Sequence, residues 1–346
     1  ANTAVGISSL YGNTTGTNNV AIGQEALKSN TTASNNIAVG LLAAGSNTTG
    51  AQNIAIGQSA LYFNTTASNN VAVGHEAGYN TTGASNTAIG TGALRANTTA
   101  SNNTAVGYQA GYSNTTGAQI TAMGFKALFA NTTGADNNAF GFGALGVNTT
   151  GNYNVAVGRQ AMDANTTGSS NTALGHNALA FNTTASNNTA VGYTALYTNT
   201  TGSENISVGA FALYANTTGG SHVAVGYEVL RLNTTGAGNT GVGLQALYSN
   251  TTASYNTAVG YKAALTNTTG AGINAFGTEA LYANTTGAGN SAFGGLQTSV
   301  ANAALRANTT GSYNSAFGTG ALSSNTTASN NTAVGYQAGY SNVTGA

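Results

Sequence analysis

The sequence lacks cysteine, proline and tryptophan altogether and has very few charged residues. Without cysteine, neither disulfides nor Cys-based metal sites can support the fold. Only 4% of the 346 residues are charged, whereas about a quarter are charged in ordinary globular proteins. Seven basic and seven acidic side chains cancel to a net charge of zero. The chain therefore has no electrostatic footprint for nucleic acid or for an anionic membrane surface.

Long apolar runs are missing as well, although 41% of the residues are hydrophobic. No run approaches the roughly 18 to 20 residues that a membrane-spanning helix needs. The first residues also lack a basic start followed by an apolar stretch. We therefore expect no membrane span, and we expect any secretion signal to have been removed or to lie outside this sequence.

The sequence does contain a repeat that covers its whole length. A glycine closes each short apolar stretch, as at Gly6 and Gly23, and it recurs twenty times with a period of 17 residues. One step of 16 indicates a one-residue deletion near 75–80, between the glycine and the next turn, and one step of 24 indicates a seven-residue insertion within 295–307. The chain 1–346 is thus predicted to be a single continuous repeat array.

Each repeat reads Asn-Thr-Thr-[Gly/Ala]-x-x-Asn-x-Ala-φ-Gly-x-x-Ala-Leu-x-x, where φ is apolar. Apolar residues bounded by Gly and Asn favour short strands, and the Asn-Thr-Thr segment fits a type I turn. One such unit cannot bury its apolar side alone, but stacked units can. We predict an all-β fold, a β-solenoid (β-roll or β-helix) of about twenty 17-residue coils with two short strands per coil.

Two apolar residues are adjacent in each predicted strand, as in Ala21 beside Ile22 and Ala26 beside Leu27. Side chains alternate between the faces of a strand, so one of each pair should point outward. In one interpretation the large residues fill the coil and the small ones let another sheet approach, which predicts lateral association. In the other, a bend at Gly turns both residues inward.

Charged and tyrosine residues share the columns that follow the glycine. Glu25 and Glu76 lie two places after it, and Tyr62 and Tyr197 lie five places after it. We expect these columns to face water. The tyrosines either stack between coils or form a contact stripe for a ligand or surface.

The repeated Asn-Thr-Thr has three candidate roles. The asparagine can cap its own turn and form an inward ladder, it can accept an N-linked glycan, or the threonines can be O-modified or present hydroxyl groups to ice. Glycans on coils about 4.8 Å apart would crowd one another, so we do not expect all sites to be occupied. The candidate residues are Asn13, Asn30, Asn47, Asn64, Asn80, Asn97, Asn114, Asn131, Asn148, Asn165, Asn182, Asn199, Asn216, Asn233, Asn250, Asn267, Asn284, Asn308, Asn325 and Asn342.

Groups for catalysis are sparse. His75, His176 and His222 occupy different places of the repeat, and the two Asp and five Glu are scattered. The repeats also lack the recurrent Asp of a calcium-binding solenoid. We expect no enzyme activity, no metal site and no cofactor.

The segments NTAVGYQA at 103–110 and NVAIG at 19–23 resemble a known repeat. They are similar to the Asn-x-Ala-φ-Gly repeats in the YadA-like heads of trimeric autotransporter adhesins, and to repeat tracts of viral and bacterial surface fibres. The likeness extends over the whole array, although the period here is longer and the Asn-Thr-Thr turn is constant. The resemblance implies an extracellular trimeric β-roll adhesin.

The two ends of the sequence are in phase with the repeat. Joining them gives NVTGAANTAVG, a normal repeat. This phase is expected either if copies stack head to tail or if the sequence is a slice of a longer array. We expect a structural fibre protein, extracellular or on a cell or virion surface, whose copies stack head to tail into a filament, with lateral association as a further candidate. Its partners would be copies of itself, with a glycan as a further candidate. The alternative is an adhesin-like trimeric binding head or an ice-binding rod.

Overall fold

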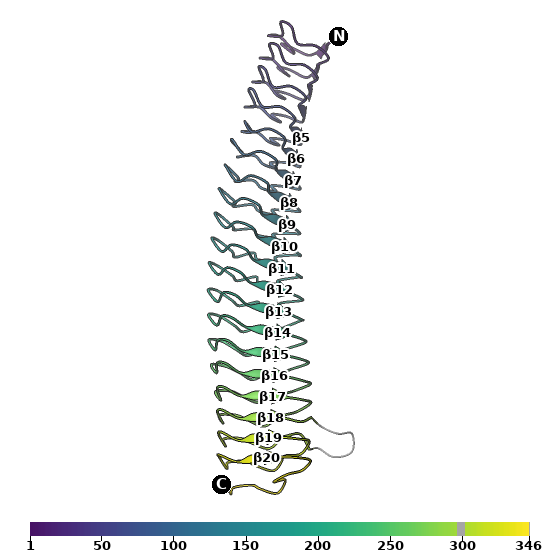
Figure 1. Cartoon of the computed structure of the whole chain (residues 1–346). Coiled ribbons are helices and arrows are strands. Elements are labelled where there is room, and N and C mark those ends of the chain that lie inside the picture. The colour runs from purple at the N-terminus through teal and green to yellow at the C-terminus, as the bar shows by residue number, and fades with distance from the viewer. Residues whose placement is uncertain (296–301, 346) are drawn as a thin grey trace. The chain divides into compact units, whose positions relative to one another are not determined.

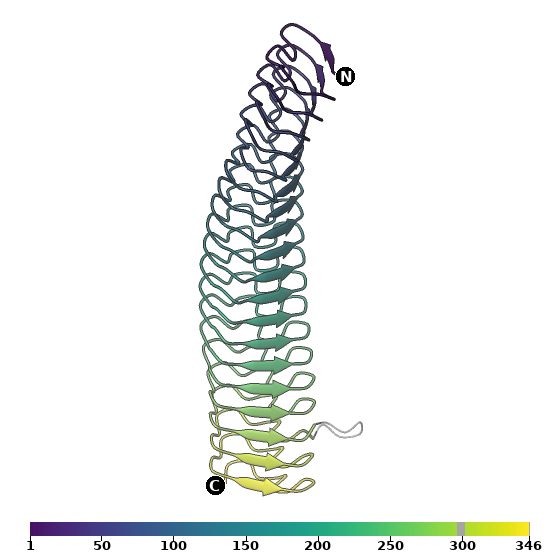
Figure 2. The same cartoon turned by 45° about the horizontal axis from the view of Figure 1, so that its top comes forward.

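The computed structural model describes residues 1–295 and 302–345. The chain divides into two compact units, unit 1 (Ala1–Ser170) and unit 2 (Asn171–Ala346). Each unit is a β-solenoid in which every coil adds one short strand to a parallel sheet (Figures 1 and 2). The predicted all-β solenoid fold is therefore confirmed. That both units form one continuous array remains a prediction.

The strands of the described residues are three residues long and follow one another at the spacing of the repeat. Those of unit 1 are β1 (Thr3–Val5), β2 (Val20–Ile22), β3 (Ile37–Val39), β4 (Ile54–Ile56), β5 (Val71–Val73), β6 (Thr87–Ile89), β7 (Thr104–Val106), β8 (Thr121–Met123), β9 (Asn138–Phe140) and β10 (Val155–Val157). Those of unit 2 are β11 (Thr172–Leu174), β12 (Thr189–Val191), β13 (Ile206–Val208), β14 (Val223–Val225), β15 (Thr240–Val242), β16 (Thr257–Val259), β17 (Asn274–Phe276), β18 (Ser291–Phe293), β19 (Ser315–Phe317) and β20 (Thr332–Val334).

Neighbouring strands pair in parallel with equivalent residues side by side. In β1 and β2, Ala4 lies opposite Ala21, and in β11 and β12, Ala173 lies opposite Ala190. This register places every side chain next to its equivalent in the next coil. The literal repetition of the sequence thus becomes columns of like residues.

The strands turn their small residue inward and their large residue outward. Ala21 is fully buried, whereas Ile22 beside it is 40% exposed. For the pair in the strand, the interpretation that the large residue fills the interior is therefore wrong, and so is the alternative that both residues point inward. That alternative does hold for Ala26 and Leu27, the pair in the segment after the glycine, because both are fully buried. Because a strand has two faces and the coil interior is narrow here, only small residues fit the inner face, which are alanine in most coils, Ser207 in β13 and Gly241 in β15.

The second predicted strand is a succession of turns. In the segment after Gly23, Glu25 and Leu27 have positive φ angles of 59° and 49°. Alternating left-handed residues curl the backbone and bring the side chains of Ala26 and Leu27 both into the core, where each is fully buried. The prediction of two strands per coil is thus wrong, because the described coils have one.

The left-handed backbone explains a restriction in the leucine column. The place of Leu27 holds Leu in most coils and Ala, Gly or Met in the others, but never Val, Ile or Thr. A β-branched side chain is strongly disfavoured at positive φ, whereas an unbranched Leu is tolerated and fills the core. Burial of each leucine stabilises its coil by about 2 kcal/mol.

The glycine that closes each strand is required by the stacking of backbones. Gly260 has a φ of 139°, and a Cβ added there would lie 2.6 Å from the carbonyl oxygen of Gly277 in the next coil. Only glycine permits both the angle and the approach.

The insertion within 295–307 includes residues 296–301, which lie outside the described residues. The chain has rejoined the repeat at Ala304, whose N–H donates to Gly294 and whose carbonyl accepts from Leu281.

Candidate functional site

The asparagine of the Asn-Thr-Thr turn forms a ladder inside each unit. The Nδ2 group of Asn47 donates to Oδ1 of Asn30 in the preceding coil at 2.9 Å, and to the carbonyl of Gly50 in its own turn at 2.9 Å. The same pair of bonds recurs at Asn131, with Asn114 at 2.7 Å and Gly134 at 2.8 Å. One side chain therefore closes its own turn and joins two coils.

Most of the twenty candidate asparagines are buried in this way. Those with exposed fractions of 0% are Asn30, Asn47, Asn64, Asn97, Asn114, Asn131, Asn148, Asn165, Asn182, Asn199, Asn216, Asn233, Asn250, Asn267, Asn284, Asn308 and Asn325. Asn13, Asn80 and Asn342 are partly exposed.

Asn80 lies outside the ladder because of the one-residue deletion. Thr81 takes the ladder place, where it is 1% exposed and its Oγ1 has no hydrogen-bond partner. Thr82 takes the next place, since its N–H and Oγ1 both bond the carbonyl of Thr98. The missing residue is therefore in the Asn-Thr-Thr turn and not between the glycine and the turn, as the sequence had suggested.

A second asparagine ladder, which the sequence analysis missed, follows the conserved spacing of Asn-x-Ala within the repeat. Oδ1 of Asn36 accepts the backbone N–H of Asn53 in the next coil at 2.9 Å, and its Nδ2 donates to the carbonyl of Gly50 at 2.9 Å. The signal was present, because this Asn recurs as regularly as the turn Asn. Its role could have been inferred by asking which side chain satisfies the carbonyl of the small turn residue.

An apolar residue replaces asparagine in the second ladder where the coil lacks its core leucine. Ile120 stands in an asparagine place and is 1% exposed. A Cβ on Gly111, which replaces the usual leucine of its coil, would lie 3.6 Å from the Cδ1 of Ile120. The isoleucine thus fills space that the missing leucine leaves.

His222 occupies another place of the second ladder and is fully buried. Its Nδ1 accepts the N–H of Asn239 at 3.1 Å, as an asparagine Oδ1 does elsewhere in the ladder. Nδ1 therefore carries no proton, and Nε2 does. Burial lowers the pKa of His222 from 6.5 to about 4, partly offset by a hydrogen bond to the backbone of Gly236.

The threonines of the turn differ in what their hydroxyl groups do. The first threonine donates to the next coil, as Thr31 Oγ1 does to the carbonyl of Thr48 at 3.1 Å. The second, such as Thr49, is exposed. One column of hydroxyl groups therefore donates hydrogen bonds to the next coil, and the other column faces solvent.

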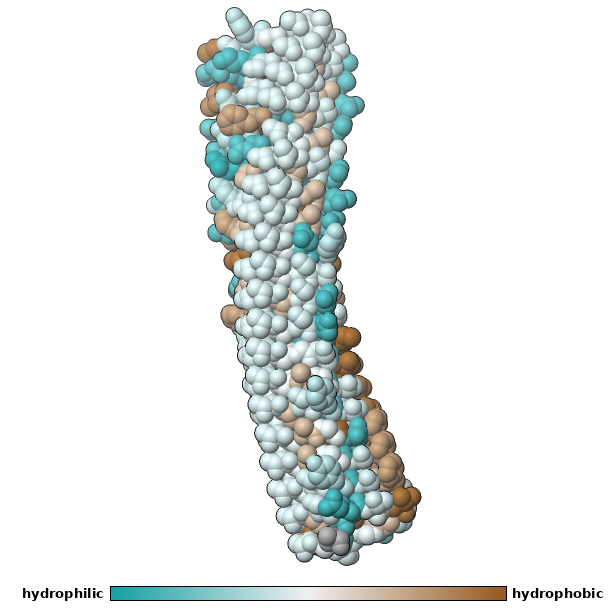
Figure 3. Space-filling view, turned by 60° about the vertical axis from the view of Figure 1, so that its left-hand side comes forward, coloured by the Kyte–Doolittle hydropathy of each residue, from teal (hydrophilic) through white to brown (hydrophobic). Residues whose placement is uncertain are grey.

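The outer face of the strands carries no charged residue in any coil. Its exposed apolar residues include Ile56 at 39% and Leu174 at 43%. In the space-filling view, brown apolar residues follow one another in a row along an edge of the molecule (Figure 3). Each unit therefore presents an uncharged strip along its sheet.

Aromatic and charged side chains gather on the turns that follow the glycine. Tyr197 and Tyr214 stack with ring centroids 5.3 Å apart, so the tyrosines of this column do stack between coils.

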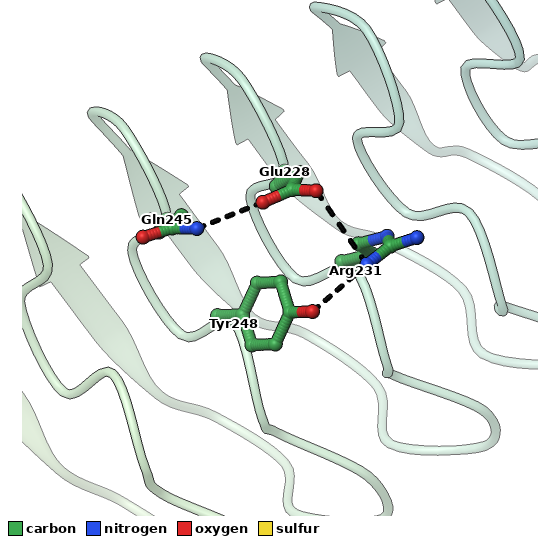
Figure 4. A network of polar contacts seen from close by, with 4 residues as sticks. All are labelled: Glu228, Arg231, Gln245 and Tyr248. Carbon is green, nitrogen blue, oxygen red and sulfur yellow. Dashed lines mark hydrogen bonds and ion pairs between the residues drawn. The ribbon is translucent and has the colours of Figure 1, made fainter.

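Arg231 illustrates how the charged residues of these turns are held (Figure 4). It donates to the Tyr248 hydroxyl at 2.8 Å and lies 3.5 Å from the Glu228 carboxylate, which also accepts from Gln245 at 2.8 Å. Partly exposed ion pairs of this kind contribute little to stability. Four of the seven basic side chains are paired with an acidic one in this way.

The described residues contain no group of three or more His, Cys, Asp or Glu side chains that could hold a metal ion. His75 is exposed, and His222 is buried in a different unit. The part of the chain that the structure describes also contains no helix long and apolar enough to cross a membrane.

Comparison with known proteins adds no relative. No family model matches the chain, and neither a curated protein nor a solved structure matches it. The resemblance to YadA-like adhesin heads therefore stays a prediction.

Proposed function

We propose that this protein is a structural segment of an extracellular fibre, on a cell or virion surface, in which copies stack head to tail. The observation that carries the proposal is the equivalence of the coils within each unit. A coil with an intact ladder offers an acceptor to one neighbour and a donor to the other, as Asn131 does to Asn148 and Asn114. A coil of a second copy can therefore continue the same ladders, and head-to-tail contacts that do not close generate filaments.

The chemistry of the surface supports a mechanical role. Only 4% of the residues are charged, and the pairs such as Arg95 with Glu76, at 2.6 Å, use opposite charges within one unit. Such a surface has little to attract nucleic acid or acidic partners. The inward asparagine bonds give each coil fixed neighbours, which suits a stiff shaft.

Electron microscopy of the purified protein tests the proposal. We expect filaments whose length grows with concentration. The variant Thr332→Pro in β20 removes a backbone donor from a strand that a second copy would extend, and proline is a natural blocker of strand edges. It should shorten the filaments while leaving the far-ultraviolet circular dichroism unchanged. Single copies at every concentration would contradict the proposal.

The adhesin-like trimeric head is the second candidate, and the uncharged outer face of the strands favours it. Side chains such as Ile206, 44% exposed, would be covered if three copies packed these faces together. Sedimentation analysis distinguishes the two assemblies, because a trimer gives one mass that does not grow with concentration. The ice-binding alternative has less support, since only the second threonine of each turn has a hydroxyl group facing solvent. A freezing assay tests it directly.

A further inference from the structure

A surface pocket of unit 1 is not explained by the fibre role. Its volume is about 320 Å³, at the lower end of the range for small-molecule sites. Phe129, Gly146 and Asp163 occupy the same place in three successive coils and line it, together with Lys126 and Gln160 from the neighbouring column. We call it the Gly146 pocket.

The pocket exists because one coil lacks a ring in a column of stacked aromatic side chains. We call the place of one ring in this column a rung. Tyr112 and Phe129 stack in that column at 5.4 Å and 15°. The next coil has Gly146 there, which has no side chain, and the coil after that has Asp163, which is too short to fill the space. The gap is therefore about one ring thick, directly beyond the face of Phe129.

Another glycine in the same column shows why this gap stays open. At Gly45 the ring of Tyr62, from the next coil, lies 3.2 Å from where a Cβ would be and covers the glycine. At Gly146 the nearest atom is Oδ1 of Asp163, 2.7 Å from the Cβ position. A ring closes the first gap, whereas a carboxylate oxygen points into the second.

The polar groups of the Gly146 pocket are balanced in charge. Asp163 supplies a carboxylate whose other oxygen lies 3.4 Å from the Gln160 amide. Burial raises the pKa of Asp163, with the Gln160 hydrogen bond acting in the opposite direction. Lys126 places its ammonium 5.1 Å from the centre of the Phe129 ring. One cation and one carboxylate favour a neutral ligand.

Aromatic surface completes the walls. Phe125 and Phe142 stack at 4.9 Å and 7°, and both are more than 40% exposed. A wholly apolar ring could stack here but would leave the Asp163 oxygen without a donor, which is costly once the pocket is covered. A ring that carries several hydroxyl groups satisfies both the aromatic face and the polar edge.

We propose that the Gly146 pocket binds a neutral pyranose ring, the unit of a glycan. The ring occupies the missing rung, with one apolar face against Phe129. Its hydroxyl groups donate to the Asp163 carboxylate, and they accept from the Gln160 amide and the Lys126 ammonium. For a single sugar we expect a dissociation constant on the order of millimolar.

Saturation-transfer NMR of the whole chain tests this, with methyl glucoside, methyl galactoside and the methyl glycoside of N-acetylglucosamine as probes. At least one should receive saturation from the protein. Gly146→Tyr supplies the rung that other coils have, and should abolish the signal. Gly146 has an ordinary φ, the Asp163 side chain nearest its Cβ position is flexible, and the Gly143 carbonyl oxygen at 3.2 Å needs to shift by only a few tenths of an ångström. The variant should therefore fold, which circular dichroism checks.

A matched pair of charge variants locates the binding. Asp163→Asn should weaken it about tenfold or more, because the acceptor loses its charge. Asp136→Asn removes the same charge from a residue of unit 1 outside the pocket and should leave binding unchanged. The proposal is overturned if no glycoside binds, if Gly146→Tyr binds as well as the natural chain, or if phenol or guanidinium binds where the sugars do not. None of these outcomes depends on whether filaments form.

Discussion

Replacing His222 by asparagine should make unit 2 less sensitive to acid. The pKa of His222 is 6.5 in ordinary surroundings and about 4 in the fold. Between these values the unfolded chain binds a proton that the folded coil excludes. The free energy of unfolding is therefore highest above pH 6.5 and falls as the pH drops through this window, until it levels off below about pH 4.

The size of the effect follows from the two pKa values. At 1.36 kcal/mol for each pH unit, their difference corresponds to about 3 kcal/mol of stability lost between pH 7 and pH 4. The main cause is burial, which disfavours the charged ring, and a protonated Nδ1 would also face the N–H of Asn239, donor against donor. Asparagine occupies the equivalent place in most coils and does not titrate. His222→Asn should thus match the natural chain at pH 7 within about 1 kcal/mol and exceed it by about 3 kcal/mol at pH 4.

Urea unfolding followed by circular dichroism at pH 7, 5.5 and 4 measures this difference. The carboxylates that titrate near pH 4 are common to both chains, so their contribution cancels in the comparison. His75→Asn, which removes an exposed histidine, is the control and should behave like the natural chain. The reasoning is refuted if His222→Asn and the natural chain lose the same stability on acidification.

Three further experiments test other parts of the fold. Thr81→Asn should restore the broken ladder and raise the free energy of unfolding by about 1 kcal/mol. The reason is that a hydrogen-bonded amide replaces a buried hydroxyl group without a partner. A loss of stability in urea unfolding would count against this prediction. Gly260→Ala should lower the free energy of unfolding by about 3 kcal/mol or more, because the added Cβ would lie 2.6 Å from the carbonyl oxygen of Gly277. Gly272→Ala should lower it by about 1 kcal/mol, because Gly272 has a φ of 65° but open space around it. Equal shifts of the melting temperature would contradict this reasoning. In a glycosylating host, mass spectrometry should find a glycan at Asn80 but none at Asn47, whose Nδ2 is buried in two hydrogen bonds; a glycan at Asn47 in folded protein would refute the buried ladder.

The period and the stacking of coils could be predicted because they depend on the spacing of residues along the sequence. A glycine such as Gly23 and a turn such as that at Asn30 mark each coil, and apolar residues between them can be buried only by stacking. The inward role of the turn asparagine could also be proposed from the sequence. Its side chain suits both a turn and a ladder.

The details that the sequence did not yield depend on backbone angles. The apolar pair Ala26 and Leu27 predicts a strand, but alternating left-handed residues make that segment a series of turns. Local propensity cannot reveal this, because an unbranched Leu is also a normal strand residue. The missing β-branched residues in the leucine column were the available signal. The Gly146 pocket could not be foreseen either, since it depends on which residues follow the glycine one coil later.

The direction of the ladder bonds has a mechanical consequence. In each unit the asparagine and strand hydrogen bonds join one coil to the next, so a force that pulls the coils apart loads these contacts in series. The coil with the weakest contact should peel away first, and the broken ladder at Thr81 marks such a coil in unit 1. Each released coil of 17 residues would lengthen the tether by about 60 Å. A pulled molecule would therefore yield in small equal steps instead of failing at once.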